Sequence, residues 1–159
     1  MRSTIAVGIT VGVLAGLWIW ASQRFGLPAW GAVVSWAAFF AAGGKRAGLA
    51  KTLPAALSGV LWGWLAALAA GALTGWSGAL AVAVGVAAFA MCAQALWRAL
   101  SFIPGTFLGA ATLFGTGVDV PATVAVLVIG VVLGLASEWS ADALVRATAR
   151  GAGIEPAAS

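Results

Sequence analysis

Long apolar stretches separated by short turns dominate this chain. About 20 apolar residues are needed to cross a bilayer's hydrocarbon core, which is about 30 Å thick. Measured against that length, the chain predicts six membrane-spanning helices within one domain over residues 1–150, followed by a flexible tail over residues 151–159. The predicted spans are residues 4–22, 27–44, 53–73, 78–97, 100–117 and 121–140.

The first apolar segment also has the charge order of a cleaved signal peptide, because Arg2 precedes it. However, residues 18–23 lack a small-x-small cleavage site, and the apolar stretch is long for a signal peptide. We therefore expect this segment to be retained as the first helix of the membrane domain.

Composition agrees with a membrane protein. The chain of 159 residues is 63% hydrophobic and only 8% charged, with a mean hydropathy of +1.08. Soluble domains carry about 45–50% apolar and about 25% charged residues, so lipid must cover the apolar surface that one core cannot bury. A formal charge of +4 would suggest nucleic acid in a soluble protein. Here the cations lie at segment ends, so we expect the lipid bilayer as partner and no nucleic acid.

The cations also predict the orientation of the helices, because cytoplasmic loops carry an excess of Lys and Arg. With six crossings and both termini cytoplasmic, only Arg24 lies outside. If spans two and five were re-entrant loops, Arg24, the Lys45–Lys51 group and Arg98 would all move outside, against this tendency. The cations expected inside are Arg2, Lys45, Arg46, Lys51, Arg98, Arg146 and Arg150.

The two halves of the chain resemble each other at a nearly constant spacing, which predicts an internal duplication. Three spans in each half, about residues 4–73 and 78–147, would place the halves as inverted repeats. Such repeats are common in transporters, with the site at the repeat interface. Chance similarity between Ala- and Gly-rich segments is the alternative. The matches pair Gly31, Ala37, Phe40 and Gly43 with Gly105, Ala111, Phe114 and Gly117, Val11 with Val84, Arg24 with Arg98, and Gly59 and Trp64 with Gly134 and Trp139.

Glycines recur at helical spacing along several spans. Membrane helices associate through small residues that allow close approach, so these stripes predict packing within or between subunits and a homo-oligomer. The alternative is that some of these glycines expose backbone to a permeation path. The stripes are Gly8, Gly12 and Gly16, then Gly59 and Gly63, Gly105 and Gly109, and Gly130 and Gly134.

The sequence contains few side chains that could act in catalysis or bind a metal. The sequence has no histidine and a single cysteine, Cys92, which argues against the usual zinc sites and Ser-His catalysis. Its acids are Asp119, Glu138, Asp142 and Glu155, and they form no facing pair within a predicted span. We expect neither an enzyme nor a protein with a metal or cofactor.

Spans two and five hold most of the polar content at membrane depth. Proline opposes helix continuity, and irregular backbone in a membrane is tolerated only where it is buried in protein or lines a cavity. The alternative is that proline begins the helix and the hydroxyls bond carbonyls of their own helix. The residues expected to line a pore or substrate path are Ser35, Trp36, Phe39, Phe40, Trp62, Pro104, Gly105, Thr106, Phe107 and Thr112.

Glu138 is the one acid on a predicted span, and Arg98 is predicted on the same side of the membrane. A structural ion pair between them would offset the burial of both charges. Proton coupling is the alternative, but no other acid or base lies at depth to pass a proton onward.

Four sequence segments stand out, Ser101–Phe107 and three others. Together they resemble the YcdZ-like family of small bacterial inner-membrane proteins, a group classed as a domain of unknown function. The likeness covers about residues 5–140, and its most specific segment is Ser101–Phe107. It implies a bacterial inner-membrane location and a full-length single domain, and it brings no substrate or catalytic residue. The other three segments are Gly12–Trp18, Ser35–Gly44 and Ser58–Trp62.

These features favour a channel or facilitator for a small neutral or weakly polar solute. The absence of acidic rings argues against a cation channel. Inverted repeats occur in channels and in alternating-access carriers alike, so both remain open. A non-transporting scaffold or accessory subunit, whose glycine stripes dock other helices, is the alternative function.

Overall fold

The computed structural model describes residues 2–73 and 75–151, and these residues form an all-α fold, as predicted. Residues 152–159 of the predicted tail lie outside the described residues. Two 3-10 turns, η1 (Gln94–Leu96) and η2 (Arg98–Leu100), separate α4 from α5. The α-helices are α1 (Arg2–Phe25), α2 (Ala29–Ala41), α3 (Lys45–Ala72), α4 (Ala79–Ala93), α5 (Ile103–Gly115) and α6 (Val120–Gly151).

Four helices in the described part of the chain are long and apolar enough to cross a membrane: Thr4–Phe25, Lys45–Ala72, Ala79–Leu96 and Val120–Ala149. The other two predicted spans form the shorter helices α2 and α5, with 13 residues each. At a rise of 1.5 Å per residue such a helix is about 20 Å long, less than the hydrocarbon thickness. For α2 and α5 to cross the bilayer, the turns that flank them would have to span the rest of the hydrocarbon thickness.

The sequence predicts a connection over Gly44–Lys51 between the second and third spans. In the structure this connection is shorter, because α3 already begins at Lys45. Pro54 therefore lies inside α3 and does not begin it. α6 likewise continues past residue 140 to Gly151. Hydropathy predicts only the apolar part of each helix. The backbone hydrogen bonds of α3 and α6 continue into the neighbouring polar residues, so both helices are longer than their apolar segments.

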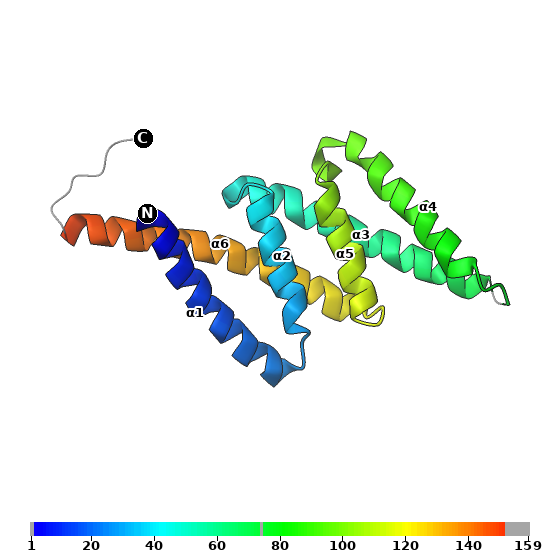
Figure 1. Ribbon diagram of the computed structural model, residues 1–159, viewed down its shortest axis with the longest axis horizontal. Coiled ribbons are helices and arrows are strands. Elements are labelled where there is room, and N and C mark those ends of the chain that lie inside the picture. The colour runs from blue at the N-terminus through cyan, green and yellow to red at the C-terminus, as the bar shows by residue number, and fades with distance from the viewer. Residues whose placement is uncertain (1, 74, 152–159) are drawn as a thin grey trace.

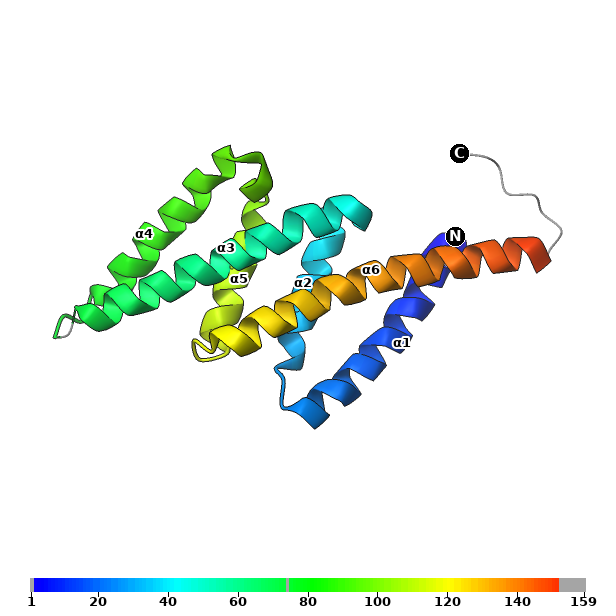
Figure 2. The ribbon, with the colours of Figure 1, turned by 180° about the vertical axis from the view of Figure 1, so that it is seen from behind.

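The two long helices organise the molecule. α3 and α6 run along the long axis of the molecule, and the short helices α2 and α5 stand side by side across one face of them, as Figure 1 shows. α4 packs along α3 at one end, and α1 packs along α6 at the other. The reverse view in Figure 2 shows α3 and α6 running across the same face of α5 and α2. The long helix of each half thus packs mainly against the short helices of the other half.

Glycines allow the backbones of these helices to touch. A Cβ atom at Gly59 would collide with the carbonyl of Thr106, and one at Gly130 with the carbonyl of Ala32. In contrast, a Cβ at Gly12 would meet nothing within 4 Å, and the same holds for Gly8 and Gly16. The predicted stripes on α3, α5 and α6 pack inside the subunit, whereas the stripe on α1 lies open.

Two apolar clusters join the halves. Ala56, Val60, Leu113 and Leu127 bring α3, α5 and α6 together, and the side chains of Leu113 and Leu127 are fully buried. Trp18, Ala32 and Val126 join α1, α2 and α6 in the same way. Because each cluster draws on both halves, neither half has a complete core of its own.

Candidate functional site

Polar side chains converge where α3, α5 and the end of α4 meet. Ser58 and Trp62 come from successive turns of α3, and Thr106 comes from the first turns of α5. Gln94 follows α4, where that helix gives way to η1. We call these four residues the Gln94 cluster.

Both polar atoms of the Gln94 amide are hydrogen-bonded within this cluster. Its Oε1 accepts a hydrogen bond from the indole Nε1 of Trp62 at 2.9 Å, and its Nε2 donates to Ser58 Oγ at 2.9 Å and to Thr106 Oγ1 at 3.2 Å. Gln94 is only 8% exposed, and Thr106 is fully buried. Burying an amide without partners would cost several kcal/mol, so the four groups hold one another in place.

The break after α4 places Gln94 there. Trp97, between η1 and η2, is extended (φ −88°, ψ 125°), which turns the chain back toward α5. Pro104 then lies in the first turn of α5, where its missing N–H costs nothing. The Pro104-Gly105 pair therefore begins a helix and opens no gap within one. Gly105 is needed because a Cβ there would meet the ring of Phe102 and Ala55.

An apolar groove between α3 and α4 leads to the Gln94 cluster. Its volume is about 300 Å³, and Trp62 is the residue that it shares with the cluster. A smaller cavity of about 180 Å³ between α3, α4 and α5 shares Ala66 and Ala87 with the groove and is also lined by Phe107. The remaining lining residues of the groove are Leu65, Ala69, Leu73, Val82, Ala83 and Val86.

Ser35 and Thr112 do not join Thr106 at a shared cavity. Ser35 Oγ donates to the carbonyl of Leu127 on α6 at 2.7 Å, and Thr112 Oγ1 donates to the carbonyl of Leu108 on its own helix at 2.7 Å. Both side chains are buried. The Ser35 hydroxyl thus links α2 to α6, whereas the Thr112 hydroxyl bonds within its own helix.

The aromatic residues of α2 also lie away from the Gln94 cluster. Trp36 and Phe40 line a separate apolar groove of about 200 Å³ against α1. The indole of Trp36 donates to Ser137 Oγ at 3.2 Å, and Phe39 is fully buried, with its ring beside the backbone of Gly134. Of the ten predicted lining residues, Trp62 and Thr106 take part in the cluster, and Phe107 lies in the adjoining cavity.

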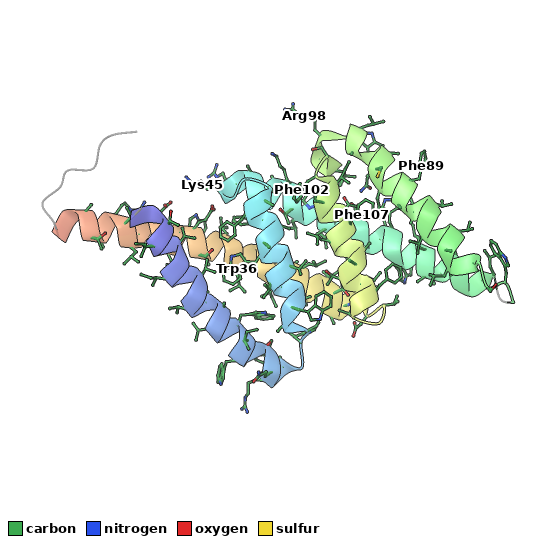
Figure 3. All side chains as sticks on the ribbon, in the orientation of Figure 1. Trp36, Lys45, Phe89, Arg98, Phe102 and Phe107 are labelled. Carbon is green, nitrogen blue, oxygen red and sulfur yellow. The ribbon has the colours of Figure 1, made fainter. Side chains whose placement is uncertain are left out.

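Glu138 and Arg98 are not brought together. The carboxylate of Glu138 accepts a hydrogen bond from the backbone N–H of Lys45 at 2.5 Å, so it caps the N-terminus of α3. Arg98 lies in η2, at a place clearly apart from Lys45 in Figure 3. The acid interacts with a helix terminus, where unpaired N–H groups and the helix dipole favour a negative charge.

Gln94 is the residue of this site that the sequence reading missed. It is a neutral amide inside a predicted span, and such a side chain at membrane depth needs partners that can only come from neighbouring helices. That signal was present, whereas the partners Ser58 and Trp62 could not be identified from spacing alone. Nothing in the described residues gathers three His, Cys, Asp or Glu side chains that could hold a metal ion.

Comparison with known proteins places the chain in a family. "Inner membrane protein YcdZ" of Escherichia coli is 35% identical over 142 residues, covering 88% of this chain and 86% of that protein. The protein of the same name in Salmonella typhimurium is 34% identical and covers 88% of each chain. "Uncharacterized protein YahC" of Escherichia coli is 35% identical over 161 residues, covering 94% of this chain and 98% of that protein.

No solved structure matches the chain. Residues 8–142 match the family described as "Protein of unknown function (DUF1097)", which is the family of the YcdZ resemblance. With its long apolar helices, the chain is a helical membrane protein. It belongs to the DUF1097 family.

Proposed function

We propose that this protein is a six-pass inner-membrane facilitator for a small neutral solute that can form hydrogen bonds. The solute path runs along the groove between α3 and α4 to the Gln94 cluster. The observation that carries this proposal is a buried amide that is hydrogen-bonded to Trp62, a lining residue of an apolar groove. The inner-membrane location follows from the names of the relatives.

The positions of the connections support six crossings. In Figure 1 the N-terminus and the α2–α3 and α4–α5 connections lie along the upper edge, and the α1–α2 and α5–α6 connections lie along the lower edge. Lys45 and Arg98 are at the upper edge in Figure 3, and Arg24 lies in the last turn of α1, which ends at the lower edge. This division matches cytoplasmic termini under the positive-inside rule.

Matching contacts support an inverted repeat. Gly59 on α3 faces the carbonyl of Thr106 on α5, and Gly130 on α6 faces the carbonyl of Ala32 on α2. By these contacts Gly59 corresponds to Gly130, one helical turn from the pairing with Gly134 that the sequence suggested. α2 and α5 run antiparallel, as expected for inverted halves.

The lining favours one class of solute. No charged residue lies among the residues of the α3–α4 groove, so a bare ion would find no partner there. The cluster at its end offers one amide and two hydroxyls, which can exchange hydrogen bonds with a neutral amide or alcohol. A pocket that is mostly apolar with a few placed polar groups is the usual form of a small-molecule site.

Flux into proteoliposomes tests the proposal, with a panel of small amides, alcohols and ions. Passage requires the Trp62–Gln94 hydrogen bond to open, and a bond worth about 1 kcal/mol corresponds to a rate change of about fivefold. Trp62→Phe keeps an aromatic ring but removes the donor, so we expect amide flux to rise about fivefold. Trp64→Phe, on the same helix and outside both cavities, is the matched control. Wild-type flux equal to that of empty liposomes would overturn the proposal.

A non-transporting scaffold is the second candidate, and one observation favours it. Across the side chains that the structure describes, no buried polar atom lacks a hydrogen-bond partner. Such a core needs no solute to complete it, and the open grooves would then hold helices of a partner. The scaffold predicts no flux for any solute in the panel and co-purification with another membrane protein.

A further inference from the structure

A second cleft lies between the start of α3 and the C-terminal part of α6, away from the Gln94 cluster. Its volume is about 700 Å³. Its charged lining consists of two cations, Lys45 and Arg46, and one carboxylate, Asp142. Its apolar lining comprises Ala47, Leu49, Leu135 and Trp139.

The two walls of this cleft are tied together by an unusual backbone. Gly44 and Lys45 both have positive φ angles, 65° and 49°. A lysine in this region is uncommon, and it is held here because Glu138 on α6 binds the Lys45 N–H. A side chain at Gly44 would collide with the same carboxylate. Glu138 is therefore used to anchor α3 against α6, and the side chains of Lys45 and Arg46 form the cleft wall.

We propose that this cleft binds the head group of an anionic phospholipid. The phosphate would lie against Lys45 and Arg46. Of the two carboxylates nearby, Asp142 lines the cleft, and Glu138 is already bound to the backbone N–H of Lys45. Leu49 and Leu135 would contact the glycerol and the first carbons of the acyl chains. Basic pockets at the ends of membrane helices bind anionic head groups in this way.

The mixed lining favours a lipid over a free phosphate ion. A small inorganic anion would use the cations alone and leave the leucines and Trp139 exposed to water. Trp139 is 65% exposed at this edge of the molecule, and tryptophan is enriched where membrane meets water. The proposal does not depend on transport, because it needs only that the Lys45 edge lies at the membrane surface.

Native mass spectrometry of the full-length protein, exchanged with equal amounts of phosphatidylglycerol and phosphatidylcholine, tests this site. We expect the wild type to retain phosphatidylglycerol preferentially. Each cation near an anionic surface contributes about fivefold in affinity, so K45Q/R46Q should lose about 25-fold. Lys51→Gln is the matched control, since Lys51 is exposed on the same helix but outside the cleft. Asp142→Asn should raise retention, because it removes the opposing charge.

Three outcomes would overturn the proposal. Equal loss of phosphatidylglycerol in K51Q and K45Q/R46Q would indicate general surface charge. Release of the lipid by millimolar inorganic phosphate would indicate a site for a free anion. Unchanged retention of phosphatidylglycerol in K45Q/R46Q would show that the lipid does not bind in this cleft. Matched thermal stability of K45Q/R46Q and K51Q in detergent establishes that the comparison concerns folded protein.

Discussion

Gly109 on α5 lies directly against the carbonyl of Ala56 on α3, so closely that a Cβ atom could not be added without collision. The reciprocal contact, Gly59 against Thr106, lies close by on the same pair of helices. Two backbones in contact cannot shift apart without losing packing along the whole α3–α5 interface. This interface is therefore the least tolerant part of the fold to added volume.

Gly109→Ala should destabilise the protein, and Gly12→Ala should not. The first adds a methyl group against backbone, and overpacking of this kind costs about 1–3 kcal/mol. The second adds it where nothing lies within 4 Å. Thermal unfolding in mild detergent, followed by size-exclusion chromatography, measures both. Equal melting temperatures for the two variants would contradict the backbone contact between Gly109 and Ala56. Separately, dissociation of an oligomer by Gly12→Ala would place the glycines of α1 at a subunit interface.

Glu138→Gln should weaken the fold by about 1 kcal/mol, because it removes the negative charge at the N-terminus of α3. Asp142→Asn, one turn further along α6 and without that hydrogen bond, is the control. Chemical or thermal unfolding measures the change.

A double-mutant cycle tests the alternative of an ion pair between Glu138 and Arg98. We expect the stability changes of Arg98→Gln and Glu138→Gln to be additive. A coupling energy near 1 kcal/mol would instead support that pair.

Trp62→Phe and Gln94→Leu should show strong coupling. Gln94→Leu leaves the donor of Trp62 without its acceptor, which costs about 1–3 kcal/mol for each buried polar group abandoned. Trp62→Phe removes that donor, so the double variant should be less destabilised than the sum of the single variants by about 1 kcal/mol. A double-mutant cycle by thermal unfolding gives the value. Strict additivity would show that the two side chains do not share a hydrogen bond.

Cysteine labelling in intact cells tests the six crossings. The native Cys92 is exposed and is replaced by alanine first. In that background, a membrane-impermeant maleimide should label R24C and leave K51C unlabelled until the cells are opened. Under the re-entrant alternative both positions lie outside and both are labelled at once. Labelling of K51C in intact cells would therefore reject the six crossings together with the inverted halves.

Hydropathy predicted the helices that must meet lipid, because that requirement acts on each residue by itself. The apolar segments over 4–22, 53–73 and 78–97 all lie within helices or within a few residues of them. It could not predict that α3 begins at Lys45, because the cap comes from Glu138, far away in the sequence. The short lengths of α2 and α5 have a local origin, since each has a proline at its N-terminal end, Pro28 or Pro104, and is followed by a glycine with positive φ, Gly43 or Gly117.

The sequence by itself determined an all-helical membrane protein of the DUF1097 family, because composition, apolar periodicity and sequence likeness need no partner. Tertiary structure alone decided which polar groups meet. Ser35, Thr106 and Thr112 are alike in chemistry, yet only Thr106 contacts Gln94, since a hydroxyl bonds whichever group the packed helices place within about 3 Å. Glycine contacts with facing carbonyls set that placement, and they join helices that are distant along the chain.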